Sequence, residues 1–147
     1  MAFQLNQFKL TNIAGETMSP GSAVIAVRLS STLSGTVKAG DVVKYNPTEV
    51  GDLPVVDKAS SGDSGNGVIL FNAKKATYAA LDVTEMAIAG SIITMVANGT
   101  IGRNTLVGWN SVSGLIQSTT GNYIGTTLDA ATASGDIIRV LVQPKLS

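Results

Sequence analysis

Cysteine and histidine are both absent from the 147-residue chain. Without cysteine there are no disulfides and no thiolate ligands for a metal. Without histidine the chain lacks the commonest general base and the commonest metal ligand. The two absences exclude serine–histidine and cysteine–histidine nucleophiles in their ordinary form. We therefore expect a protein that is not an enzyme and that holds no metal and no cofactor.

Charged residues are also scarce: they make up 14% of the chain, against about 25% in an average soluble protein. Ten basic residues balance ten acidic ones, so the formal net charge is +0. Nucleic-acid binders usually carry a basic surplus that neutralises phosphates, so no nucleic-acid partner is expected. A free monomer with so few charges would be poorly soluble. Either serine, threonine, asparagine and glutamine make the surface polar, or other subunits cover much of it; we favour the second explanation.

Long apolar runs are missing as well. The first ten residues have no basic start and no continuous apolar stretch, unlike a signal peptide. The longest mostly apolar segment, 86–97, contains Gly90, Ser91 and Thr94 and is too short to cross a bilayer. We expect a chain that is made in the cytoplasm and has no membrane partner.

Glycine, by contrast, is frequent: 16 residues punctuate short runs rich in β-branched side chains. One pattern recurs, in which glycine and then aspartate or serine precede two apolar residues, in 39–45, 89–95 and 134–140, with a looser copy in 20–27. Glycine adopts a positive φ without steric cost, and the aspartate or serine can bond a backbone N–H just beyond it. The two apolar residues that follow enter a sheet, and because neighbours face opposite sides of a strand, both sides are expected to be covered.

This spacing predicts an all-β fold, a compact sandwich or barrel. Further strands are expected at 55–56, 67–71, 76–81, 105–109, 114–118 and 123–127, with a hairpin turning over 110–114. Helix is expected to be scarce. Residues 128–133 form one turn or a tight loop, and 74–85 favour strand over a short helix because they contain β-branched and aromatic residues.

We interpret residues 1–13 as an extended N-terminal arm ahead of a single β domain, 14–147. Four side chains of the arm are apolar among glutamine, asparagine and lysine, as in an extended segment with a bulge: Phe3, Leu5, Phe8 and Leu10. Large apolar side chains on an arm should dock on a surface. That surface belongs either to the arm's own domain or trimer, or to another protein that the arm joins by strand addition. The remaining alternative is a disordered arm.

Several segments resemble catalytic or ligand-binding sites, but a structural role accounts for each of them. The loop 62–67 is rich in glycine, yet it lacks the Gly-Lys-Ser/Thr ending of a phosphate-binding loop. Asp57 and Asp63 lack the acid order and the final glutamate of a calcium loop, so we expect a solvated loop. Asp41 and Asp136 each follow a glycine at a strand start, where a turn role suffices without a catalytic carboxylate pair.

Aromatic residues make up only 5% of the chain. Trp109, Tyr45, Tyr78 and Tyr123 lie inside strand-like runs, so they are expected to pack in the core or in a subunit interface. The alternative is a platform on which a sugar stacks. Such a site would expose Trp109 or a tyrosine in a groove beside aspartate or asparagine.

The chain resembles the small capsid decoration, or cement, proteins of tailed bacteriophages over most of its length. The resemblance rests on the arm and on glycine-and-hydrophobe patterns in 37–45, 67–70, 89–97, 124–131 and 135–140. It implies a β domain of jelly-roll or β-tulip type that forms a homotrimer on the outer surface of the head, at three-fold or quasi-three-fold sites. It also implies that the trimer clamps subunits of the major capsid protein, with the arm's Phe3, Leu5, Phe8 and Leu10 as the capsid-binding residues.

Our first interpretation is therefore a structural virion protein that stabilises the capsid by bridging major capsid subunits. Internal DNA pressure pushes capsomers apart, and a trimer that engages several subunits adds contacts that must break before the shell opens. The alternative is a carbohydrate- or receptor-binding β module of a virion or secreted protein.

Overall fold

Short β strands joined by glycine turns make up the regular structure of the chain. The computed structural model describes residues 14–15, 23–112, 114–118 and 121–145. These residues contain twelve strands and no helix, which confirms the all-β prediction. In this part of the chain, no helix is long and apolar enough to cross a bilayer. The predicted division into an arm of 1–13 and one domain of 14–147 stays a prediction.

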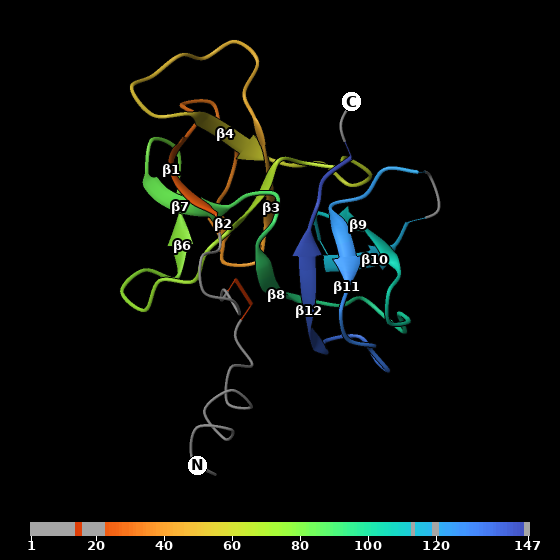
Figure 1. The fold of residues 1–147 in the computed structure, drawn as a ribbon. Coiled ribbons are helices and arrows are strands. Elements are labelled where there is room, and N and C mark those ends of the chain that lie inside the picture. Colours follow the sequence, from red (N-terminus) through yellow and green to blue (C-terminus); the bar gives the residue numbers. More distant parts are fainter. Residues whose placement is uncertain (1–13, 16–22, 113, 119–120, 146–147) are drawn as a thin grey trace.

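Five strands between residues 24 and 87 close into a barrel, drawn in orange to green in Figure 1. Their order is β1 (Val24–Leu29), β4 (Val55–Lys58), β3 (Val42–Tyr45), β5 (Gly67–Ile69) and β7 (Val83–Ala87). All neighbours are antiparallel except β1 and β4, which run parallel. Closure removes the free strand edges on which another chain could pair. A separate two-stranded pair joins β2 (Val37–Lys38) to β6 (Thr77–Tyr78).

Five strands between residues 92 and 142 form an antiparallel sheet beside the barrel (Figure 1). Its order is β10 (Gly114–Gln117), β9 (Leu106–Asn110), β11 (Gly125–Thr127), β12 (Ile137–Val142) and β8 (Ile92–Val96). The sheet curls strongly, because a bridge between Ala97 and Leu115 brings its two ends together. The predicted hairpin is confirmed, since Asn110 of β9 pairs with Gly114 of β10.

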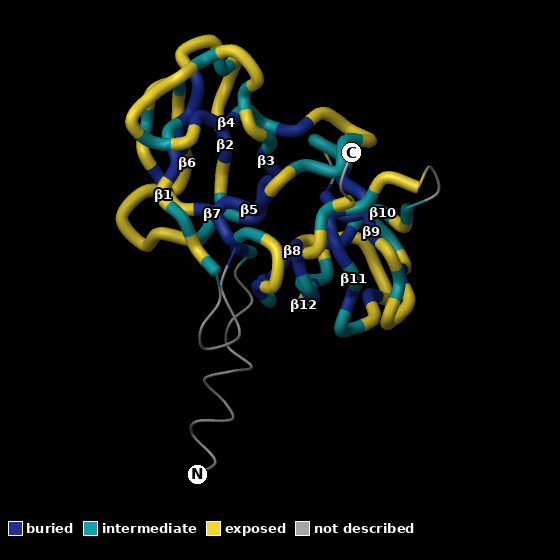
Figure 2. The backbone as a smooth tube through the Cα atoms, turned by 45° about the horizontal axis from the view of Figure 1, so that its top comes forward, coloured by how far each residue is buried: buried dark blue, intermediate teal, exposed yellow. Residues whose placement is uncertain are grey.

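The buried apolar side chains form two cores. Figure 2 shows the buried strands in dark blue and the exposed loops around them in yellow. Strand β3 serves both: Val42 belongs to the core of the second sheet, and Val43 belongs to the core inside the barrel. Both side chains are fully buried, so the prediction that this strand is covered on both sides is confirmed. In β12 the prediction is only half right, because Ile138 is buried and Ile137 is half-buried.

The recurring glycines form turns, as predicted. Gly40, Gly90 and Gly135 have φ values of 87°, 96° and 97° and each directly precedes the residue that leads into β3, β8 or β12. The N–H of Asp41 donates to the carbonyl of Lys38 at 3.0 Å, which closes a four-residue turn. The looser copy in 20–27 lies partly outside the described residues.

The predicted direction of the side-chain bonds is wrong. Asp41 Oδ2 accepts from the N–H of Lys38 at 3.0 Å, and Asp136 Oδ2 accepts from Ala133 at 3.1 Å, so both carboxylates close back on the start of the turn. The N–H groups beyond them enter strands that pair with β5 and β8. Ser91 differs again, since its hydroxyl donates to the carbonyl of Ala23 at 2.8 Å.

Several strand boundaries differ from the predictions. Strand β5 ends at Ile69 instead of residue 71, because the N–H of Phe71 donates to the carbonyl of Gly15 at 3.0 Å. The strand expected over 76–81 is limited to β6, since Ala79 to Asp82 form a turn. The segment 74–85 contains strands β6 and β7 and no helix, and 128–133 is a loop.

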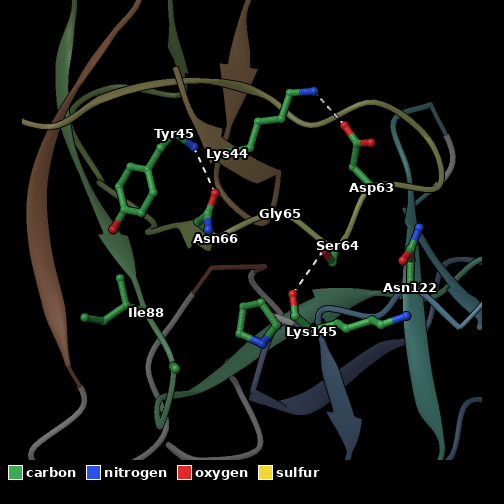
Figure 3. Close-up of a pocket in the computed structure, with 11 residues that line it drawn as sticks. Lys44, Tyr45, Asp63, Ser64, Gly65, Asn66, Ile88, Asn122 and Lys145 are labelled. Atoms are coloured by element: carbon green, nitrogen blue, oxygen red, sulfur yellow. Dashed lines mark hydrogen bonds and ion pairs between the residues drawn. The ribbon is translucent and has the colours of Figure 1, made fainter. Parts of the chain in front are cut away.

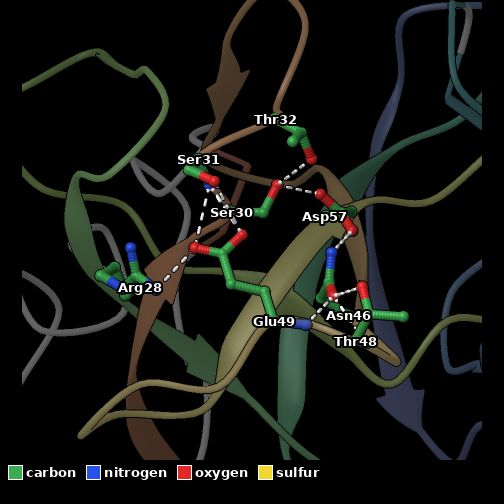
Figure 4. Close-up of polar contacts among 8 residues, drawn as sticks. All are labelled: Arg28, Ser30, Ser31, Thr32, Asn46, Thr48, Glu49 and Asp57. Carbon is green, nitrogen blue, oxygen red and sulfur yellow. Dashed lines mark hydrogen bonds and ion pairs between the residues drawn. The ribbon is translucent and has the colours of Figure 1, made fainter.

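A polar network holds the long loop after β3 against the barrel (Figure 4). Asp57 of β4 accepts from the buried hydroxyl of Ser30 and, at 2.7 Å, from the side-chain amide of Asn46. Glu49 pairs with Arg28 at 2.7 Å and accepts from the N–H of Ser31 at 3.0 Å. These bonds join the end of β1 to the loop, so the carboxylates have structural partners.

Candidate functional site

The predicted capsid-binding residues Phe3, Leu5, Phe8 and Leu10 lie outside the described residues. Their docking surface therefore stays a prediction. The structure does describe residues 14–15, which follow the predicted arm. The N–H of Gly15 donates to the carbonyl of Thr94 in β8 at 2.7 Å, while its own carbonyl accepts from Phe71. Gly15 thus bonds both to β8 of the second sheet and to the segment that follows β5 of the barrel.

Only glycine fits at this junction. Gly15 has a φ of 85°, a conformation that other residues rarely adopt. A Cβ atom here would lie 2.7 Å from the carbonyl oxygen of Ile69 and 2.9 Å from the Cβ of Ala39. The close approach fixes the backbone at Gly15 against Ile69 and Ala39.

A groove of about 630 Å³ lies between the end of β3 and the second sheet. Figure 3 shows Tyr45 and Ile88 on one side of it, Asn122 and Lys145 on the other, and Asn66 between them. The barrel strand, its loops and the C-terminal part of the chain all contribute. No single stretch of sequence predicts this combination.

Polar contacts hold the walls of the groove in place. The N–H of Tyr45 donates to Asn66 Oδ1 at 3.0 Å, and Asn122 Nδ2 donates to the carbonyl of Gly62 at 3.0 Å. Lys44 Nζ pairs with Asp63 Oδ2 at 2.8 Å. The loop 62–66 is thereby tied to both halves of the molecule. The loop is exposed or half-exposed, as expected for a solvated loop, although Asp63 and Asn66 have these specific partners and Asp57 lies in β4 instead.

The hydrogen bond from Lys44 lowers the pKa of Asp63, and the backbone N–H of Ser60 adds to the effect against the opposing cost of burial. Asp63 is therefore a carboxylate at neutral pH, and the pair contributes no net charge to the groove. A general acid needs the opposite shift. The groove offers amide groups, an aromatic face and a fixed ion pair, which are groups that hold a ligand.

The aromatic residues divide into buried and exposed ones. Trp109 is 4% exposed and Tyr78 is 2% exposed, which confirms core packing for both. Tyr45, the last residue of β3, is 43% exposed and lines the groove, so it is not a core residue; its packing in a subunit interface stays a prediction. Tyr123 is half-buried. The sequence criterion of an exposed tyrosine beside aspartate or asparagine is therefore met at Tyr45.

The acidic candidates have structural roles. Asp41 and Asp136 close turns, and backbone hydrogen bonds from Thr132 and Ala133 lower the pKa of Asp136. Asp57 binds the network at Ser30. In the described ranges, no three acidic side chains gather closely enough to hold a metal ion.

Sequence reasoning did not single out Asn122 or Lys145. Asn122 contacts a carbonyl 60 positions away, and Lys145 meets Ser64 from the C-terminal end of the chain, with Ser64 Oγ 3.4 Å from its carbonyl. Neither residue belongs to a local pattern, so only the folded chain reveals the groove. Asn66 lay within the glycine-rich segment already noted, but its partner on β3 was not predictable.

No family model matches the chain, and a comparison with curated proteins finds no match. Among solved structures, the fold is similar to that of the N base of head fiber gp8.5 in bacteriophage phi29, with a TM-score of 0.59. The two sequences are 13% identical, and the match covers 85% of this chain and 98% of that one. The likeness spans nearly all of the neighbour's chain, and at this identity it shows a shared fold.

Proposed function

We propose that the chain is a structural protein of a bacteriophage head. The observation that supports this most strongly is the fold shared with nearly the whole length of a head-fiber base. The sequence patterns led independently to the capsid decoration proteins. Both lines of argument converge on the same class of virion component.

In its finer form, the proposal is a homotrimer that binds the outer surface of the capsid at three-fold or quasi-three-fold sites and bridges major capsid subunits. The low charge content supports it, because a chain with 14% charged residues gains from a surface covered by neighbours. Apolar side chains exposed in the single chain, such as Val112 at 94% and Val50 at 91%, fit the same view. A trimer that holds several subunits multiplies modest contacts through effective concentration.

The arm supplies the capsid contact in this proposal, through Phe3, Leu5, Phe8 and Leu10. Purified protein is added to expanded heads that lack it, and bound protein is measured by co-sedimentation and negative-stain imaging. The full chain is expected to saturate at a fixed ratio to the capsid protein, and deletion of residues 1–13 to abolish binding. Heads that take up none of the full chain would overturn the decoration function.

Point substitutions separate the arm's apolar side chains from its length. Phe3→Ser with Phe8→Ser is expected to weaken head binding at least tenfold, roughly the loss of two buried aromatic contacts. Gln4→Ala with Gln7→Ala is the matched control and should bind as the unaltered chain does. Equal binding by both variants would remove the arm from the mechanism while leaving head attachment intact.

The oligomeric state has its own measurement. Sedimentation velocity is expected to give a particle of three times the 15.0 kDa chain mass. A monomer that stays soluble at millimolar concentration would contradict the trimer and the idea that neighbours cover the surface.

A further inference from the structure

We propose that the groove beside Tyr45 binds a saccharide of more than one ring, with one ring against the tyrosine face and bonded to Asn66, and another bonded to Asn122 on the opposite side. This inference rests on the groove alone and does not depend on attachment to a phage head. It meets the criterion that the sequence argument set for a carbohydrate site, at a residue other than Trp109.

The groove has the size and position of a ligand site. Its volume of about 630 Å³ lies within the roughly 300–1,000 Å³ typical of small-molecule pockets. It lies between the barrel and the second sheet, and such junctions are common places for ligands. The bonds from Asn122 to Gly62 and from Ser64 to Lys145 join its two sides, so its width is set before any ligand enters.

Tyr45 supplies an apolar face where a sugar needs one. Trp109 and Tyr78 bury their rings in the cores, but Tyr45 keeps 43% of its surface exposed at the end of β3. Figure 3 shows its ring above Ile88 and facing the open space of the groove. One face of a pyranose ring presents C–H groups while its edge carries hydroxyls. A flat aromatic surface beside an amide matches both features.

The two amides are held in defined orientations. Asn66 Oδ1 accepts from the N–H of Tyr45, which turns its Nδ2 donor toward the space between Ile88 and Lys145 (Figure 3). Asn122 Nδ2 donates to the carbonyl of Gly62, so its Oδ1 is the acceptor that it can offer a ligand. A sugar hydroxyl both donates and accepts. Fixed partners of both kinds lower the entropy cost of binding.

The charges favour a neutral or singly acidic saccharide over a polyanion. Among the described residues that line the groove, the charged ones are Lys44, Asp63 and Lys145. Lys44 and Asp63 neutralise each other at 2.8 Å, so Lys145 leaves a net charge of one. Binding of nucleic acid or polyphosphate would need several unpaired cations.

The test begins with purified, labelled full-length chain on an array of neutral and acidic saccharides that also carries polyphosphate. The best saccharide is then titrated in solution by calorimetry. Tyr45→Ala is expected to raise its Kd at least about tenfold, whereas Tyr45→Phe, which keeps the ring, stays within about threefold. Phe71→Ala removes another exposed aromatic side chain outside the groove, and this matched control should leave the Kd unchanged.

Ala89→Trp is a second variant that does not depend on truncating β3, because exposed Ala89 lines the groove and a bulky side chain there fills it. It is expected to abolish binding in a chain whose thermal unfolding is unchanged. A folded chain that binds none of the saccharides overturns the proposal, as does an unchanged Kd in both Tyr45→Ala and Ala89→Trp, or a preference for polyphosphate. Two further measurements separate this result from the proposed head function. Tyr45→Ala is expected to bind heads as the unaltered chain does, and the chain without residues 1–13 is expected to bind the saccharide.

Discussion

Leu81 has the backbone conformation that glycine has in the other turns. Its φ is 70°, and it sits where Gly40 and Gly135 sit, one residue before an aspartate. Asp82 completes the likeness: its N–H donates to the carbonyl of Ala79 at 3.2 Å, and its Oδ2 accepts from the N–H of Ala79 at 2.9 Å. A Cβ atom makes this conformation costly, by about 1–2 kcal/mol.

Substitution at these turns should therefore change stability in opposite directions. Leu81→Gly is expected to raise the free energy of unfolding by about 0.5–1 kcal/mol, since relief of strain exceeds the added freedom of the unfolded chain. Gly135→Ala is expected to lower it by at least about 1 kcal/mol. The added methyl group would meet no atom within 4 Å, so the cost is one of backbone conformation. Urea unfolding measures both; equal midpoints for the two variants and the unaltered chain would contradict the assignment.

These turns also show how far local sequence predicts structure. Glycine followed by aspartate or serine marked Gly40, Gly90 and Gly135 correctly, because the conformational demand lies within four residues. Leu81 escaped notice, because leucine carries no preference for a positive φ. Asn122 escaped for a different reason: its partner, the carbonyl of Gly62, is remote in sequence.

At the scale of elements, the parallel pairing of β1 with β4 is the contact that needs outside support. No hairpin connects the two strands, since β2 and β3 intervene along the chain. Asp57 supplies a link, because it binds Ser30 just beyond β1 and Asn46 just beyond β3 (Figure 4). Ser30 is fully buried, so its hydroxyl depends on partners inside the protein.

Removal of this link should destabilise the barrel. Asp57→Ala is expected to lower the free energy of unfolding by about 2–3 kcal/mol, because a buried hydroxyl and an amide lose their acceptor. Asp52→Ala, in the exposed loop before β4, is the control and should stay within about 0.5 kcal/mol. Denaturant unfolding followed by tryptophan fluorescence reports the change, since Trp109 is buried. If Asp57→Ala matches Asp52→Ala, the network does not hold the barrel.

Strands were predictable where β-branched residues cluster, and their partners were not. The paired apolar residues of β3, β8 and β12 identified these strands from local sequence alone. The strands that pair with them are set by how the whole chain folds. Strand β3, for example, lies between β4 and β5, and Val42 and Val43 face different cores. The groove at Tyr45 depends on that arrangement, so local sequence patterns could not predict it either.

At the scale of the whole molecule, the sparse charges are placed in specific bonds. Arg139 holds Asp129 at 2.7 Å, Lys75 holds Asp82 at 2.7 Å, and Lys44 holds Asp63 at 2.8 Å. Each pairing lowers the pKa of its carboxyl group, first through the side-chain hydrogen bond from the cation. Backbone hydrogen bonds lower the pKa values of Glu49 and Asp136 as well.

These lowered carboxyl pKa values make stability depend on pH on the acid side. A carboxyl group whose pKa is lower in the folded state stabilises the fold fully above its unfolded pKa, about 4, and loses that contribution as pH falls through the folded value. Histidine is absent, so no side chain with an ordinary pKa titrates between about pH 5 and 8. The urea midpoint is expected to be level from about pH 5.5 to 8 and to fall below about pH 4.

Asp129→Asn with Asp136→Asn should make the urea midpoint less dependent on pH below about pH 4, because these groups then no longer take up protons on unfolding. A midpoint that drops between pH 7 and 5.5, or holds constant to pH 3, would show that these carboxylates do not control the acid stability of the fold.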